Sequence, residues 1–272
     1  MSSETKKAEL TFLFLIVLLF FPAVVFSQIN QTDASGLRQG LWQKKQANGQ
    51  LLYEGHFKNG KPVGEWKRFH ENGQVKALIH YAGDTAKTQL FDEANKLLAE
   101  GNYINQEKEG IWMYFADNKK VSEEQFVNGL KHGVSRKFYD SVKIMEETEW
   151  LKGKREGKSQ VFFEDGKPYM QYKMANDKRN GLCIIYFQNG VQQLVANYEN
   201  DLRVGDWNYH DETGKLLYTL KYKNGALLNP EVRDSLERIQ FKNLEKNKGS
   251  ILDPEKFMED PGGYMMKKNI YR

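Results

Sequence analysis

The segment GEWKRFHENG, residues 64–73, decides the fold, because its pattern returns throughout the middle of the chain. A Gly is followed two residues later by Trp, five later by an aromatic residue, and nine later by the Gly of an Asn-Gly turn. Repeats separated by 22 to 24 residues are typical of stacked arrays. We find eight copies, which begin at Gly40, Gly64, Ala86, Gly110, Gly133, Gly157, Gly181 and Gly205.

Each copy is expected to form two strands around a tight turn. Asn-Gly is the strongest short hairpin signal, because both turn residues adopt positive φ. The strand after the turn alternates, as residues 51–58 show, and period-2 alternation indicates a half-buried strand. A lone hairpin is marginally stable, so the copies must stack. The sequence therefore predicts an all-β fold, an elongated, twisted antiparallel sheet of stacked β-hairpins over residues 28–228, with a C-terminal capping helix.

The glycines and aromatic residues of the pattern are predicted to be structural. The aromatic columns are expected to form the core of the sheet, and an exposed ladder for glycan or lipid is the alternative. Positions two and five lie three residues apart, so either a bulge intervenes or both faces carry aromatic side chains. The third, fourth and fifth copies have the weakest turn sequences, which predicts irregular hairpins there. The predicted structural residues are Gly40, Trp42, Gly49, Gly64, Trp66, Phe69, Gly73, Gly110, Trp112, Phe115, Gly157, Gly181, Gly205 and Trp207.

Two segments carry a resemblance to a known family, namely GEWKRFHENG (residues 64–73) and YEGHFKNG (residues 53–60). They resemble MORN repeats, in particular the variant type found in bacterial proteins catalogued as YwqK-type antitoxins of toxin–antitoxin systems. The resemblance covers roughly residues 36–228. It implies a stack of hairpins and a role in protein interaction or lipid association, whereas the antitoxin role is implied by the family label alone.

The first 27 residues have the pattern of an export signal. Lys6 and Lys7 precede the uncharged stretch Leu10–Phe26, and Ser27 offers a small residue for cleavage before Gln28. We expect cleavage and a periplasmic, cell-envelope or secreted location. An uncleaved membrane anchor is the alternative, although the apolar stretch is shorter than the about 20 residues that a spanning helix needs.

Composition and charge favour a binding protein over an enzyme or a nucleic-acid binder. The net charge of +4 is spread over a chain with 28% charged residues, so no concentrated basic stripe is present. Cys183 is the single cysteine and falls in the Trp column, which predicts a buried thiol. His56 and His80 share a column but are expected about 9.6 Å apart, too far for one metal ion. We therefore predict no catalytic site, no cofactor and no metal.

The C-terminal part departs from the repeat. Pro230 begins a helical pattern that predicts a helix over residues 230–246, within a segment 229–248 that covers the sheet edge. The tail, residues 249–272, carries a tandem Asp-Pro-x-x-aromatic-Met motif. Either it folds back on the array or it is a linear docking motif. Its candidate docking residues are Phe257, Met258, Tyr264 and Met265.

Together these features predict a non-enzymatic, exported repeat protein that serves as a protein-binding scaffold in the cell envelope. Its expected partner is an unidentified protein and no nucleic acid. Antitoxin-like neutralisation of a toxin and association with a membrane or glycan are the alternatives, and contact with a membrane or glycan is less favoured.

Overall fold

The computed structural model describes residues 29–246 and divides the chain into two compact units, residues 29–106 and 107–246. The first unit contains β1 (Gln31–Thr32), β2 (Arg38–Lys45), β3 (Leu51–Lys58), β4 (Lys61–Phe69), β5 (Val75–Ala82), β6 (Thr85–Phe91) and β7 (Leu97–Ile104). The second contains β8 (Glu107–Ala116), β9 (Lys119–Val127), β10 (Leu130–Lys131), β11 (Gly133–Phe138), β12 (Ile144–Leu151), β13 (Lys154–Phe162), β14 (Pro168–Ala175), β15 (Lys178–Tyr186), β16 (Gln192–Glu199), β17 (Leu202–His210), β18 (Leu216–Lys223), β19 (Ala226–Leu227) and the helix α2 (Pro230–Lys246).

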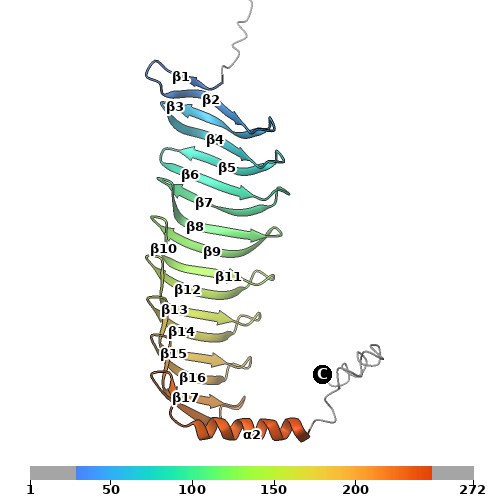
Figure 1. Cartoon of the computed structure of the whole chain (residues 1–272), viewed down its shortest axis with the longest axis vertical. Coiled ribbons are helices and arrows are strands. Elements are labelled where there is room, and N and C mark those ends of the chain that lie inside the picture. Colours follow the sequence, from blue (N-terminus) through green and yellow to red (C-terminus); the bar gives the residue numbers. More distant parts are fainter. Residues whose placement is uncertain (1–28, 247–272) are drawn as a thin grey trace, which may run out of the picture. The chain divides into compact units, whose positions relative to one another are not determined.

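Within each unit, strands that follow one another along the chain pair in antiparallel fashion. The pairing runs from β1 to β7 in the first unit and from β8 to β19 in the second, with β9 also paired to β11. Figure 1 shows these strands lying side by side in each unit. The predicted all-β fold of stacked antiparallel hairpins is confirmed.

A register shift explains how positions two and five of a repeat are accommodated. In β4 the shift lies between Arg68 and Phe69, immediately before position five. The same shift precedes position five in the strand that opens each of the eight repeats. A bulge, one of the two alternatives for this misfit, is therefore a regular part of the repeat.

The 22-residue spacing between the second and third repeats has a local cause. Between β3 and β4, residues 64–65 are skipped as Gly55 pairs with Trp66 and His56 with Val63. The β5–β6 pair has no such bulge and continues in regular register. The two residues missing from the 22-residue spacing are the two bulge residues, so on the side of the preceding strand Ala86 pairs with Tyr81 as Pro62 pairs with Phe57. On the side of the following strand Ala86 pairs with Tyr103 as Gly64 pairs with Tyr81, which agrees with the assignment of Ala86 to position one.

The prediction of irregular hairpins in the third and fifth repeats is wrong. The turn at residues 92–96 closes with the Asp92 N–H donating to the Lys96 carbonyl, and residues 139–143 close in the same way. The Asn-Gly turn at residues 46–50 has the same hydrogen bond. Asn95 (φ 62°) and Val142 (φ 58°) adopt the positive φ that glycine supplies elsewhere. The fourth repeat differs, because residues 117–118 form a two-residue loop between Ala116 and Lys119.

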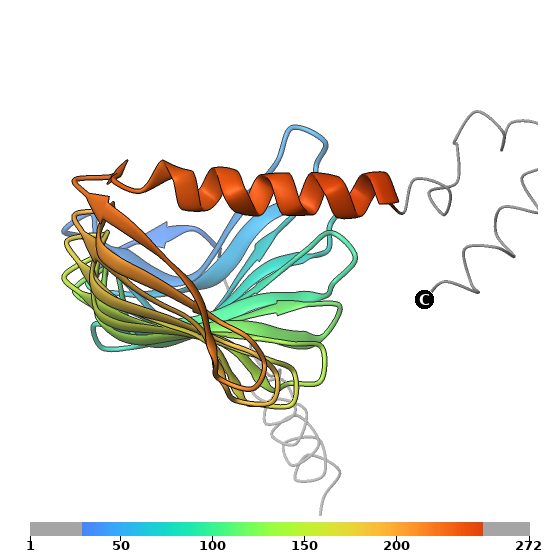
Figure 2. The ribbon, with the colours of Figure 1, turned by 90° about the horizontal axis from the view of Figure 1, so that it is seen from below.

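The helix predicted over residues 230–246 is present as α2, and its first turn fixes it to the end of the second unit. The Asn229 side chain accepts a hydrogen bond from the Lys221 N–H at 2.8 Å and donates to the Thr219 carbonyl at 2.8 Å. Val232 packs against the apolar cluster under β15–β18. Beyond this turn the helix leaves the strands (Figure 2), and Ile239 (56% exposed) remains open to solvent. The helix thus covers the sheet through its first turn.

One face of the sheet carries the core. Trp66, Trp112 and Trp207 are 7%, 0% and 4% exposed, so the interpretation of the Trp column as core is confirmed at these positions. In the second unit, Trp207 belongs to a buried cluster with Cys183 and Tyr222, to which Tyr198 adds a half-buried ring. Among residues 29–246, no helix has both the length and the apolar character needed to cross a bilayer.

Candidate functional site

A column of basic side chains lies over the aromatic core face. Each member stands two residues before the Gly that opens a repeat. For every member except Arg155, which pairs with Asp177, the cation lies over an aromatic ring of its own hairpin. The Lys108 ammonium lies 4.4 Å from the Trp112 ring centre, and the Arg203 guanidinium carbon lies 4.9 Å from that of Trp207. Cation–ring contacts at this distance are attractive. The column consists of Arg38, Lys108, Lys131, Arg155, Arg179 and Arg203.

The first unit shows how closely the rings of this face are packed. Trp66 lies edge-on between Phe57 (4.8 Å between ring centres) and Tyr81 (6.1 Å). Its indole N–H donates to the His56 carbonyl at 3.0 Å, so the polar edge of the ring is satisfied. Arg38 covers the open side of Phe57, with its guanidinium carbon 4.4 Å from the ring centre.

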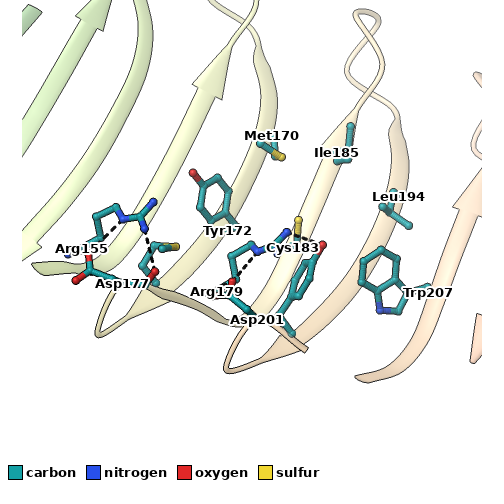
Figure 3. A pocket seen from close by; sticks show the side chains of 12 residues that line it. Arg155, Met170, Tyr172, Asp177, Arg179, Cys183, Ile185, Leu194, Asp201 and Trp207 are labelled. Carbon is teal, nitrogen blue, oxygen red and sulfur yellow. Dashed lines mark hydrogen bonds and ion pairs between the residues drawn. The ribbon is translucent and has the colours of Figure 1, made fainter. Parts of the chain in front are cut away.

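The second unit carries a groove on its own aromatic face, over β14–β17 (Figure 3). Its volume is about 350 Å³, and its apolar floor includes Met170, Ile185 and Leu194. The groove lies where the Trp column contains Cys183, whose side chain is much smaller than an indole. A pocket of this size can receive a few side chains of a partner.

Two arginine–aspartate pairs form one rim of the groove. The Arg179 Nε donates to Asp201 at 2.9 Å, and its main-chain N–H donates to the same carboxylate oxygen at 3.0 Å. Arg155 and Asp177 repeat this arrangement one hairpin earlier. The hydrogen bond from the Arg179 side chain is the main reason why the pKa of Asp201 lies below its ordinary value. Both carboxylates therefore stay ionised in neutral solution.

The next hairpin lacks the carboxylate of this pattern. Gly225 stands in its tight turn where the two preceding turns have Asp177 and Asp201. The Arg203 guanidinium donates to the Tyr222 hydroxyl at 3.0 Å and lies over two rings. Within residues 29–246, no carboxylate pairs with it. Arg203 can therefore accept an anionic group from outside the chain.

Cys183 is poorly suited to covalent chemistry. Its side chain is 5% exposed, and burial raises the pKa of the thiol, although Arg179 opposes this shift. The predicted burial of Cys183 is confirmed.

The structure places the remaining predicted residues as follows. The glycines that open a repeat at Gly40, Gly64, Gly110, Gly157, Gly181 and Gly205 have φ between +64° and +105°. Gly49 and Gly73 lie in the tight turns, with φ of 86° and 83°. Trp42, Phe69 and Phe115 are half-buried. Phe257, Met258, Tyr264 and Met265 lie outside the described residues, as do the expected export signal and the tail.

Metal chemistry finds no support in the geometry. Within the described part of the chain, no group of three or more His, Cys, Asp or Glu side chains could hold an ion. His56 and His80 lie on β3 and β5, two strands apart.

The basic column was not predicted from the sequence, although its Lys and Arg residues recur at the spacing of the repeats. A Lys or Arg near a tight turn usually points into solvent, so the regular spacing of these residues was the one available signal. Sequence alone does not show that the cation lies over a ring of its own hairpin.

Comparison with solved structures shows weak similarity. The chain is 11% identical to a chain in the crystal structure of the GtfA/B complex bound to UDP and GlcNAc, covering 49% of this chain and 26% of that one with a TM-score of 0.21. It is 14% identical to TarM, covering 54% and 21% of the two chains with a TM-score of 0.17. A mutant of S. aureus TarM in complex with Fondaparinux, alpha-GlcNAc-glycerol and UDP gives 14% identity, coverage of 52% and 20%, and a TM-score of 0.17. These TM-scores are too low to indicate a shared fold.

The chain spans 20% to 26% of the length of these structures, and no curated protein matches it. The family model described as MORN repeat variant matches residues 38–59, 62–82 and 203–224. Each match begins at the level of the basic column and covers two strands and the turn between them, namely β2–β3, β4–β5 and β17–β18. These three matches, in register with the hairpins, support a protein built from MORN repeats.

Proposed function

We propose that this chain is a non-enzymatic, exported repeat protein whose aromatic core face binds a protein partner in the cell envelope. The groove over β14–β17 carries this proposal, because it combines an apolar floor with an ordered charged rim. Interfaces of binding proteins are enriched in Tyr, Trp, Met and Arg, and this groove contains all four.

Arg203 adds a preference for acidic partners. Its neighbours Arg155 and Arg179 are each neutralised by an aspartate of the chain, whereas Arg203 donates to a tyrosine hydroxyl, lies over two rings and has no carboxylate partner among residues 29–246. A carboxylate of the partner would complete the same arrangement at Arg203. The arginines and aspartates of the groove are paired with one another in ion pairs, which favours binding over catalysis.

The binding face can be tested by photocrosslinking in cells of the native host. A photoreactive phenylalanine analogue at Met170 would lie on the groove floor, whereas its neighbour Tyr169 (39% exposed) points to the opposite face. We expect a protein adduct from position 170 and none from position 169. Arg203→Glu should weaken the adduct by about tenfold or more, the usual cost of losing a charged hydrogen bond.

Lys221→Glu is the matched control, because it makes the same charge change on the opposite face of the last repeat. Equal adducts from positions 169 and 170, or equal losses from Arg203→Glu and Lys221→Glu, would refute a partner on the core face.

Export is proposed from the sequence of the first 27 residues. Fractionation of host cells, followed by mass spectrometry of the N-terminal residue, should recover a chain that begins at Gln28 in the periplasmic or secreted fraction. An intact N-terminus in the membrane fraction would instead indicate an anchor.

Antitoxin-like binding is a second candidate, favoured by the resemblance of the repeats to those of YwqK-type proteins. It requires the crosslinked partner to be a protein that is toxic when expressed without this chain. A harmless partner would exclude it and leave the scaffold role.

A further inference from the structure

The first unit contains a hollow on the aromatic face, over β4–β7. Its volume is about 540 Å³, and all of its lining residues belong to residues 61–106. Tyr81, Tyr103, Ile79 and Leu90 are among the residues that line it. Thr88 also lines it, but the Thr88 hydroxyl donates to the Ala86 carbonyl at 3.2 Å. The hollow therefore offers methyl groups and ring faces, beside the charged side chain of Arg68.

The neighbouring repeat shows what normally occupies this place. There Trp66 lies between Phe57 and Tyr81, with the Tyr53 ring centre 5.7 Å from its own. These four rings fill the space above β3–β5, and the Trp66 side chain is only 7% exposed. The aromatic positions of a MORN hairpin in this unit thus hold a planar ring between two others.

The hollow exists because the following repeat lacks two of these rings. Thr88 takes the place of Trp66, because Trp66 pairs with Gly55 on the preceding strand and Thr88 pairs with Ile79, which lies 24 residues after Gly55. Ala77 takes the place of Tyr53, because Tyr53 pairs with Lys44 and Ala77 pairs with Arg68, which lies 24 residues after Lys44. The flanking ring positions are retained as Tyr81 and Tyr103. Two flanking rings are therefore present on either side of a space in which the other two rings of the neighbouring repeat are absent.

The floor of the hollow differs from the Trp66 site in one respect. A Cβ at Gly55 would lie 2.1 Å from the indole of Trp66, so that indole lies directly on the glycine backbone. In the next repeat Ile79 stands at the position of Gly55. A ring in the hollow must therefore lie above the Ile79 side chain, nearer to the mouth, where it can enter from solvent.

We propose that this hollow binds a planar aromatic side chain of a partner polypeptide, held above Ile79 between Tyr81 and Tyr103. The mouth is polar, with Lys61, Asp84 and Asn105 among its lining residues. These groups can hydrogen-bond the peptide groups on either side of the inserted ring. The site is separate from the groove over β14–β17 and does not depend on the role of that groove.

Indole is the probe for this site, because it is the side chain of Trp without a backbone. We expect its titration into the full chain to shift the methyl resonances of Ile79 and Leu90 through its ring current, and to leave the methyl resonances of Ile185 in the other groove less affected. Saturable shifts at Ile79 would support the site. Shifts confined to Ile185, or no shift up to the solubility limit of indole, would overturn it.

Two variants test the geometry of the walls and floor. Ala77→Tyr restores the ring that the neighbouring repeat has at Tyr53, and it should weaken indole binding at least about tenfold by filling the hollow. Thr88→Val is the matched control, because it changes the same lining without adding a ring, and binding should stay within about twofold. If Ala77→Tyr fails to fold, Tyr103→Leu removes a wall instead and should also weaken binding. Unchanged binding in a folded Ala77→Tyr or Tyr103→Leu variant would overturn the proposal.

Two further probes decide the class of occupant. Methyl β-glucoside at matched concentration should bind more weakly than indole, and tighter binding of the sugar would overturn the assignment to an aromatic side chain. A synthetic peptide of residues 251–266 contains the two aromatic-Met pairs of the tail. Binding of this peptide that exceeds that of N-acetyl-tryptophanamide would overturn the assignment to a separate partner.

Discussion

Replacement of Trp112 by Ala should lower the free energy of unfolding of its part of the array by roughly 3–5 kcal/mol, the usual cost of removing a buried Trp side chain. Trp112 is 0% exposed, and the Lys108 ammonium lies over its ring. Burial lowers the pKa of Lys108, so removal of the ring should also return that pKa toward its ordinary value. Amide hydrogen exchange and the titration of the Lys108 side chain measure the two effects.

The loss should be local, because each hairpin of a repeat array contacts only its neighbours. We expect amides of β8 and β9 to lose protection and those of β17 and β18 to keep theirs. Trp112→Phe is the control, because it leaves a ring in the column, and it should lose roughly half as much or less. Equal losses in the two variants, or equal loss of protection at β17 and β18, would contradict the packing described for Trp112.

The hairpin fold could be predicted from the sequence because its signals are local. Gly73 supplies the positive φ of its turn, whereas Asn72 does not adopt the positive φ expected of both turn residues and instead accepts a hydrogen bond from the Gln74 N–H through its side chain. The alternation of residues 51–58 specifies one buried face. These signals recur at a fixed period, so each repeat supports the interpretation of the others. The same local character explains the helix α2, whose start at Pro230 follows from the conformation of proline.

The candidate sites were harder to predict from the sequence than the fold, because they depend on which side chains contact one another across strands. Arg203 and Lys221 both read as exposed cations in the last repeat, and only the structure shows that Arg203 lies over Trp207. The loss of a two-residue bulge before Thr88 shows in the sequence only as a 22-residue spacing and as Ala86 and Thr88 in place of Gly and Trp. Neither this spacing nor the period of the basic residues shows, without the strand pairing, where the side chains lie.

A shared rule connects the two hollows, each considered within its own unit. One lies where Thr88 replaces the Trp of the repeat and the other where Cys183 does. In both cases aromatic side chains remain among the lining residues, namely Tyr81 and Tyr103 in one and Tyr172 and Tyr198 in the other. Loss of the Trp ring, accompanied in the first unit by loss of the ring at Ala77, thus leaves a concave site within the antiparallel hairpins of each unit.

Replacement of Gly55 by Ala is the second change with a large expected effect. Its new Cβ would lie 2.1 to 2.4 Å from three atoms of the Trp66 indole, which no rotation of the methyl group can relieve. The indole is itself held by Phe57 and by its hydrogen bond to the His56 carbonyl. We expect a loss of about 3 kcal/mol in the free energy of unfolding, at the upper end of the range for overpacked cores. Urea denaturation or hydrogen exchange of β3 and β4 measures it.

The physical cause can be separated from a general preference for glycine by a double-mutant cycle. Trp66→Ala alone should be destabilising, because it removes a buried ring. In the Trp66→Ala background, however, Gly55→Ala should cost much less than in the native chain, since the Cγ, Cδ2 and Cε2 atoms that it would strike are gone. The coupling between the two changes should therefore be favourable and amount to about 2 kcal/mol, within the range for side chains in direct contact. Additive effects would show instead that the close approach of the indole is not what excludes a side chain at this position, where the backbone of Gly55 has no positive φ that would itself require glycine.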